Sequence, residues 1–230
     1  MKKHSLINIA RLFITSSRRI FSYILLLTFF ILLNASCQIH EIAIPQSGVS
    51  SISVVMDNNY PPYTFLDSDG NLKGILIERW KLWSTKTGIT VQITGVDWTD
   101  AQIRMQAGEF DVIDTIFLTE AREKIYDFSE PYVTIDVPVY FNNRISGITD
   151  VASLRGFPVA VKADDAAIDF LLSKGVKNLV KYESYEAIIK AAANHEVIVF
   201  VIDQPPADYF LYLYNLHSEF NSTQPLYSGQ

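Results

Sequence analysis

Two hydrophobic periodicities alternate along the chain from about residue 52 onward. Short runs of β-branched and aromatic residues, typical of strands, are separated by stretches with apolar residues three or four positions apart, typical of helices. In the stretch 74–87, Leu76, Trp80 and Trp83 share one helical face, and Gly88 follows as a stop signal. This alternation predicts an α/β fold with parallel sheets and helices on both sides.

The predicted elements form two groups. The first contains strands at 53–56, 89–94 and 111–113, a helix at 74–87, and a helix that starts with a capping box at Thr99 and Gln102 and ends at Gly108. The second group contains strands at 137–141, 158–161, 179–182 and 197–202, and helices at 149–154, 165–173, 185–192 and 205–214. The run 197–202 is apolar throughout, as expected for a strand buried on both faces.

The N-terminal segment has the pattern of a bacterial export signal. Basic residues precede an apolar stretch at 20–33, which is shorter than the ~20 residues that span a bilayer. The stretch 33–37, Leu-Asn-Ala-Ser-Cys, resembles a lipobox and makes Cys37 a candidate for lipidation, although Asn34 departs from that motif. Cleavage without lipidation and an uncleaved anchor remain alternatives. We expect a leader or anchor at 1–37, a tether at 38–51, and a location in the periplasm or on the extracytoplasmic face of the inner membrane.

Composition excludes several classes of function for the exported part. The chain has 19 basic and 25 acidic residues, and five of the basic ones lie in the leader, so the remainder carries a formal charge of −11. This charge argues against a nucleic-acid partner and leaves the leader or a lipid as the contact with the membrane. The four histidines lack metal-ligand spacing, and neither a P-loop nor a Gly-x-Ser-x-Gly motif is present. We therefore expect no cofactor, no metal and no enzymatic activity.

Polar and aromatic side chains come directly after four of the predicted strands, two in each group. Ligands of open parallel sheets bind beyond the carboxyl ends of strands, so these residues predict a cleft between two lobes. The candidate ligand-binding residues are Asp57, Tyr60, Tyr63, Asp114, Thr115, Phe117, Arg122, Asp164, Asp165 and Asp203.

Six of these candidates also have a structural interpretation. Tyr60 and Tyr63 flank two prolines and could pack in a stiff turn of their own lobe. Arg122 lies in a charged run and could be an exposed surface residue, although its planar donor fork suits a carboxylate. Asp203 could cap the helix that Pro205 opens, and Asp164 and Asp165 could cap the helix after them.

A series of short motifs resembles the family-three extracellular solute-binding proteins over residues ~52–228. The motifs, in order, are Tyr60-Pro-Pro-Tyr63, Gly74-Ile-x-x-Glu78, Asp97-Trp98, Gly108-x-x-Asp111, Thr119-x-x-Arg122, Asp127-Phe-Ser-x-Pro-Tyr132, Leu154-x-Gly156 and Val201-Ile-Asp203. The resemblance implies the two-lobed type two periplasmic-binding-protein fold, with lobes at 52–134 and 135–224. It further implies that Arg122 holds a ligand carboxylate, Asp203 an ammonium group, and that Tyr60 covers the ligand side chain.

Three departures from the family pattern modify this expectation. Bulky residues at 116–118 replace small ones before Arg122, and Ala163-Asp164-Asp165 replaces a Gly-Thr or Gly-Ser pair. The second change removes a hydroxyl and adds two acids, which favours a cationic or amine-bearing ligand. The third departure is length: residues 225–230 resemble only the start of the return to the first lobe, so the fold is expected to be truncated there.

We expect binding of a small polar solute, amino-acid or amine-like, for transport or sensing. The partner is then the small-molecule ligand, together with either a membrane permease or a fused or associated signalling domain. One alternative is the input domain of a membrane histidine kinase or diguanylate cyclase, which the stretch 74–88 resembles most. A minor alternative is an enzyme similar to cyclohexadienyl dehydratase, with Asp165 as the acid.

Overall fold

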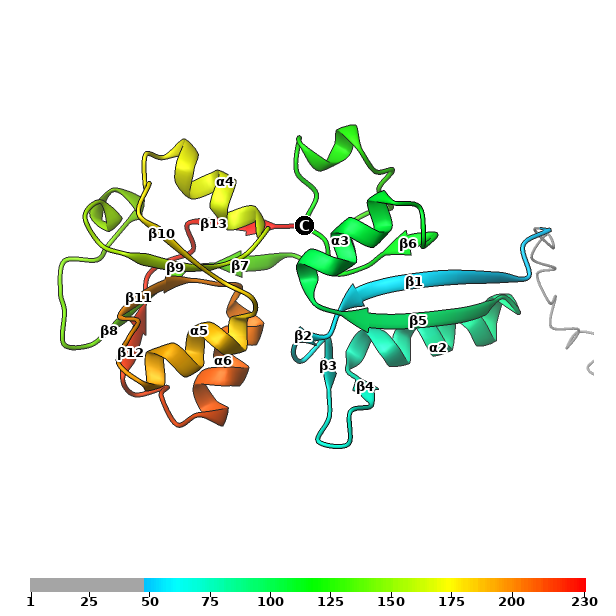
Figure 1. Ribbon diagram of the computed structural model, residues 1–230, viewed down its shortest axis with the longest axis horizontal. Helices are drawn as coiled ribbons and strands as arrows, with labels where there is room; N and C mark the ends of the chain where they lie inside the picture. The colour runs from blue at the N-terminus through cyan, green and yellow to red at the C-terminus, as the bar shows by residue number, and fades with distance from the viewer. Residues whose placement is uncertain (1–47) are drawn as a thin grey trace, which may run out of the picture. The chain divides into compact units, whose positions relative to one another are not determined.

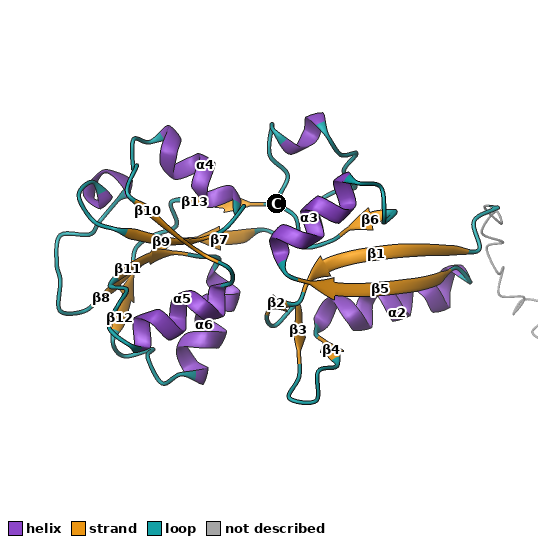
Figure 2. Cartoon of the chain, in the orientation of Figure 1, coloured by secondary structure: helices purple, strands orange, loops and turns teal. Residues whose placement is uncertain are grey.

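The computed structural model describes residues 48–230, so the predicted leader, Cys37 and most of the predicted tether lie outside the described residues. Residues Gln46–Gln230 form one compact unit. Within this unit, two sheets with their own hydrophobic cores form the two lobes (Figures 1 and 2). No helix in residues 48–230 combines the length and the apolar character needed to cross a bilayer.

The sheet of the first lobe is parallel, as predicted, with strand order β5-β1-β6. Its strands are β1 (Ser51–Asp57), β5 (Thr90–Val96) and β6 (Val112–Ile113). Alternate residues of β1 face opposite sides: Val54 and Met56 pack against α2 (Ile75–Thr87), and Val55 packs against α3 (Trp98–Gln106). This two-sided burial explains why β1 is apolar along most of its length.

A small hairpin sheet precedes α2. Strands β2 (Asn59–Tyr60), β3 (Thr64–Leu66) and β4 (Leu72–Lys73) form it in sequence order. Gly74 joins it to α2 with a φ of 128°, and a Cβ there would lie 2.1 Å from the carbonyl oxygen of Tyr63. Gly88, with a φ of 73°, ends α2, as predicted.

The capping box predicted at Thr99 and Gln102 is wrong. The helix α3 begins one residue earlier, with Asp97 as its N-cap. The hydroxyl of Thr99 donates instead to the Asp164 carboxylate at 2.7 Å, and the Gln102 amide donates to the Asp164 carbonyl at 3.2 Å. A contact with the other lobe has therefore replaced the local motif.

The sheet of the second lobe has strand order β10-β9-β11-β8-β12 and is mixed, which corrects the expectation of a parallel sheet. Strands β9 (Val159–Lys162), β10 (Leu179–Tyr182) and β11 (Val199–Val201) are parallel. Strand β8 (Val139–Asn142) runs antiparallel to β11 and to β12 (Phe220–Ser222).

The predicted strand 137–141 is split at Pro138, which lacks the N–H that a continuous strand would need. The segment before the proline is β7 (Ile135–Val137), which pairs with β13 (Tyr227–Gly229) outside both main sheets. The carbonyl of Gln230 accepts a hydrogen bond from the Leu118 amide at 2.7 Å, so the end of the chain contacts the first lobe.

Helices cover both faces of the second sheet (Figure 2). One core contains α4 (Ala166–Ser173), and the other contains α5 (Tyr185–Ala193) and α6 (Gln204–Leu213). Two short 3₁₀ turns complete the structure, η1 (Arg122–Lys124) and η2 (Val151–Leu154). The predicted helix 149–154 is thus a single 3₁₀ turn, with a capping box of Asp150 and Ser153.

Candidate functional site

The carboxyl ends of β1 and of β9 and β11 meet around a small cavity of about 20 Å³ between the lobes. Such a space holds about one water molecule, so a larger ligand needs the lobes to separate first, as in hinge-closing proteins. The side chains around the cavity are Asp57, Tyr60, Trp98, Thr115, Phe117, Arg122, Lys162, Asp165, Ala166, Tyr185 and Asp203.

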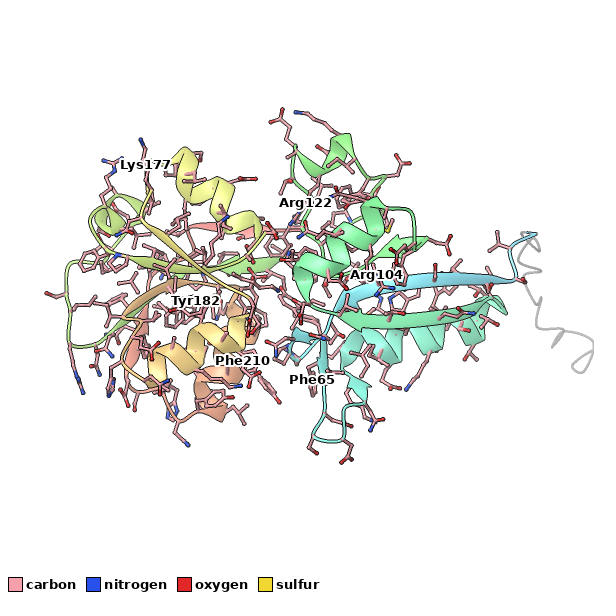
Figure 3. All side chains as sticks on the ribbon, in the orientation of Figure 1. Phe65, Arg104, Arg122, Lys177, Tyr182 and Phe210 are labelled. Atoms are coloured by element: carbon pink, nitrogen blue, oxygen red, sulfur yellow. The ribbon has the colours of Figure 1, made fainter. Side chains whose placement is uncertain are left out.

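Direct contacts join the lobes around this cavity. Asp164 has a φ of 55°, and its carbonyl accepts hydrogen bonds from the Trp98 indole at 3.1 Å and from the Arg122 guanidinium at 3.4 Å. On another side, the Phe65 ring lies 5.8 Å from the Tyr209 ring (Figure 3). The lobes are therefore in a closed arrangement.

Asp203 is buried at the end of β11, with 4% of its surface exposed. Its Oδ2 accepts a hydrogen bond of 2.6 Å from the Tyr60 hydroxyl, and its Oδ1 is buried without a partner among the described residues. Asp203 is the N-cap of α6 by position, but its side chain makes no capping hydrogen bond. Burial raises the pKa of Asp203 to about 7, and the nearby Asp165 charge adds to this rise.

Arg122 is half-buried between the lobes (Figure 3). Its guanidinium donates to the backbone carbonyls of Phe117, at 3.1 Å, and Asp164. No carboxylate in residues 48–230 forms an ion pair with it. Burial lowers the pKa of Arg122, although an arginine remains protonated at any physiological pH. The sequence interpretation of Arg122 as an exposed surface residue is wrong.

Lys162 and Asp57 form a buried ion pair across the lobes. Their exposed fractions are 3% and 2%. The Lys162 ammonium lies 4.5 Å from the ring centre of Tyr185, 5.4 Å from that of Trp98 and 5.8 Å from that of Tyr60. Ion pair and rings together form a cage around one positive charge.

The Asp165 carboxylate accepts one hydrogen bond that caps a helix and another from a tyrosine at the cavity. Its Oδ1 accepts from the Ala167 amide at 2.8 Å and caps α4, as one sequence interpretation predicted. Its Oδ2 accepts from the Tyr185 hydroxyl. A hydroxyl has one proton, so this bond leaves Tyr185 unable to donate to Asp203 as well.

Seven of the candidates from the sequence surround the interlobe cavity. They are Asp57, Tyr60, Thr115, Phe117, Arg122, Asp165 and Asp203.

Three other candidates lie elsewhere. The carboxylate of Asp164 is bonded to Thr99, so this residue joins the lobes rather than facing the cavity. Tyr63 stacks on Tyr60, with 5.6 Å between ring centres, and contributes to a larger hollow of about 710 Å³ that is lined mostly by the first lobe. Asp114 accepts hydrogen bonds within the first lobe and does not reach the interlobe cavity.

Trp98, Lys162 and Tyr185 were missed as candidates. Lys162 ends β9, so the expectation that ligands bind at the carboxyl ends of strands could have found it. Tyr185 falls on the apolar face of α5 and has the pattern of a core residue in the sequence. Trp98 is the first residue of α3 and belongs to the motif Asp97-Trp98, which does not by itself indicate a role in binding.

Residues 52–194 match the family of bacterial extracellular solute-binding proteins, family 3. The chain belongs to this family. Residues 52–194 are thus a solute-binding region of this family, and the α/β fold is the one predicted from the motifs.

Two kinds of relative resemble this solute-binding protein. It is 30% identical to the virulence sensor protein BvgS of Bordetella bronchiseptica over 121 residues, which cover 52% of this chain and 10% of that protein. It is 26% identical to the L-cystine-binding protein TcyJ of Escherichia coli over 113 residues, 48% of this chain and 42% of that protein. The match thus spans about a tenth of the sensor and less than half of the cystine-binding protein.

Solved structures show the same fold. A histidine kinase sensor domain with similarity to periplasmic binding proteins superposes with a TM-score of 0.74 and 22% identity, over 79% of this chain and 80% of that one. An ancestral arginine-binding protein bound to arginine superposes with a TM-score of 0.68 and 21% identity, over 78% of this chain and 84% of that one.

Proposed function

We propose that the interlobe cleft binds a small molecule that carries both an amino group and a carboxylate, as an α-amino acid does. The observation that carries the proposal is a pair of incompletely satisfied groups of opposite charge at one cavity. Arg122 lacks an ionic partner among residues 48–230, and Asp203 has a buried oxygen without a hydrogen-bond donor there. A zwitterion would satisfy both groups at once.

The charges around the cavity support an amine-bearing ligand. Lys162 neutralises Asp57, whereas Asp165 and Asp203 face a single further cation, Arg122. The cleft therefore has one negative charge in excess when all three carboxylates are ionised, which favours a ligand with an ammonium group over one that carries only a carboxylate. The relatives that bind L-cystine or arginine by their names are consistent with this class of ligand.

The experiment is calorimetric titration of the chain with each of the twenty L-amino acids, followed by the same titration of Arg122→Ala. We expect at least one amino acid to bind and the variant to lose about 100-fold in affinity, because a shielded bidentate pair contributes two charged hydrogen bonds. Arg104→Ala is the matched control, since Arg104 pairs with Glu109 on the surface of the first lobe. Failure of all twenty amino acids to bind would refute the proposal.

Sensing is a second candidate for the physiological role, beside delivery to a membrane permease. The similarity to BvgS and to a histidine kinase sensor domain favours it. Cells that lack the gene distinguish the two roles. Loss of uptake of a radiolabelled amino acid indicates transport, and normal uptake with a lost transcriptional response indicates sensing.

We also propose that the predicted leader holds the protein at the extracytoplasmic face of the membrane, through a lipid on Cys37 or through an uncleaved anchor. The family of extracellular solute-binding proteins is consistent with this location. Metabolic labelling with an alkyne fatty acid separates the two forms. Label that disappears in Cys37→Ala supports the lipid, whereas membrane association without label supports the anchor.

A further inference from the structure

We propose that Lys162 is a tethered occupant of a binding site for a primary ammonium group, and that it thereby restricts which ligands the cleft accepts. The site consists of the Asp57 carboxylate and the rings of Trp98, Tyr60 and Tyr185. Its occupant comes from the second lobe, and its carboxylate and two of its rings come from the first.

The contacts of Lys162 are those of a bound cation. Its ammonium bonds a carboxylate that is 2% exposed, and three aromatic rings lie 4.5 to 5.8 Å from it. A buried charge is costly unless it is paired, so removing the ammonium would leave Asp57 uncompensated. An aromatic cage around a carboxylate attracts any small ammonium ion that reaches it.

The position of Lys162 links this site to closure of the lobes. Lys162 is the last residue of β9 and Asp57 the last residue of β1, so their bond can form only when the two strand ends face each other. A free ligand that bridges two lobes favours the closed state by its contacts with both. The side chain of Lys162 bridges the two lobes in the same way, so it favours the closed state although it is part of the chain.

Because Lys162 occupies the ammonium site, it should affect which ligands bind. This expectation rests on the proposed amino-acid site. A ligand with a second amino group on its side chain would compete with Lys162 for the cage. We therefore expect the wild-type cleft to discriminate against L-lysine and L-ornithine. Removal of the Lys162 side chain would open the cage to such ligands.

Chemical rescue tests the site without requiring any amino acid to bind. Lys162→Ala deletes three methylene groups and the ammonium, and n-propylammonium has the same composition with a methyl end. We expect n-propylammonium chloride at tens of millimolar to raise the melting temperature of Lys162→Ala by about 3 °C or more and to leave the wild type unchanged. The uncharged n-propanol is the matched ligand control.

Two variants complete the design. Lys181→Ala removes an exposed lysine of the neighbouring strand β10 and should show no rescue. The double variant Asp57→Asn/Lys162→Ala removes both charges, so it should be more stable than Lys162→Ala and insensitive to n-propylammonium. If Lys162→Ala does not fold alone, the yield of refolding with and without n-propylammonium replaces the melting temperature.

The outcomes are distinguishable from those of the proposed function. Rescue by n-propylammonium but not n-propanol supports the ammonium site, even if no amino acid binds. Absence of rescue, or equal rescue of the double variant, overturns it. If an amino acid binds the wild type, Lys162→Ala should gain at least tenfold in its preference for L-lysine over L-alanine, and an unchanged preference overturns the role in selectivity.

Discussion

Asp114 in the first lobe and Asp203 in the second lobe follow strands in the same way, but their carboxylates differ in how many hydrogen bonds they accept. Each comes at the end of a short strand and directly after an isoleucine, Ile113 or Ile202. Asp114 accepts hydrogen bonds from the Trp80 indole at 2.7 Å, from the Thr115 amide at 2.7 Å and from the Tyr132 hydroxyl. Asp203 accepts one side-chain bond, and its other oxygen is without a partner in the described structure.

These two aspartates show how structural and binding carboxylates differ when both are buried. A carboxylate that its own lobe satisfies stabilises that lobe, and it has little capacity left for a ligand. A carboxylate with an unused oxygen is costly to keep buried, and a ligand that supplies a donor recovers that cost. The difference depends on distant residues, not on the strand that carries each aspartate.

The largest expected effect is on stability at Asp114. Asp114→Ala leaves the Trp80 indole and the Tyr132 hydroxyl without their acceptor, so the free energy of unfolding should fall by about 3 kcal/mol in urea denaturation. Asp169→Ala, at an exposed position of α4, is the control and should change little. An unchanged stability of Asp114→Ala would remove the distinction between the two aspartates.

Asp203→Asn should have the reverse effect on stability. The pKa of Asp203 is raised to about 7 by burial, so the folded state binds a proton that the unfolded state releases near pH 4. Ionisation therefore destabilises the folded protein as the pH rises from about 4 to 7. A rise of about three pKa units corresponds to about 4 kcal/mol. At pH 8 the variant should be about 2 kcal/mol more stable than the wild type, because the buried amide that replaces the carboxylate is itself incompletely paired. At pH 3 the two proteins should be equally stable. Equal stability at both pH values would contradict the conclusion that one buried oxygen of Asp203 has no hydrogen-bond donor.

The same titration predicts a pH dependence of ligand binding. An ammonium group needs the ionised form of Asp203, so calorimetry should show affinity falling by about fivefold between pH 7 and pH 6. The groups that face Asp203 are Tyr60, Lys162, Asp165 and Tyr185. The profile of Asp203→Asn should be flat over this range; the same decline in that variant would assign it to another group.

The smallest effects separate the two stacked tyrosines. Tyr60→Phe removes the one side-chain hydrogen bond that residues 48–230 make to Asp203, so the midpoint of the pH profile of binding should move to higher pH. Tyr63→Phe removes a hydroxyl outside the interlobe cavity and should change affinity by less than about twofold. Equal effects of the two substitutions would show that the Tyr60 hydroxyl has no special role in ligand binding and that only the stacked rings contribute to it.

Local patterns in the sequence were sufficient for the main helices and strands of both lobes and for seven of the residues around the cavity. The expectation that ligands bind at strand ends places Arg122 and Asp203 at one cavity, because parallel strands bring their carboxyl ends together. The same expectation could not separate Asp114 from Asp203. The donors to Asp114 include Trp80 and Tyr132, which are 34 and 18 residues away.

The parts that could not be predicted depend on contacts between the lobes. Lys162 bonds Asp57 over a separation of 105 residues, and Thr99 bonds Asp164 over 65. The second contact overrides the capping box that the local sequence predicts. The division of the predicted strand 137–141 into β7 and β8 depends on Pro138, whose effect was overlooked although it is visible in the sequence.

The most direct test of the amino-acid site compares three ligands that differ by one charged group. The tightest-binding L-amino acid of the panel is titrated into the chain alongside its decarboxylated amine and its desamino acid. The amine, which lacks the carboxylate, should bind the wild type more weakly than the amino acid does, and Arg122→Ala should not weaken its binding further. The desamino acid, which lacks the ammonium group, should also bind the wild type more weakly, and Asp203→Asn should not weaken its binding further. Additive losses in both variants would contradict the proposed site, because they would place neither Arg122 nor Asp203 on the charged groups of the ligand.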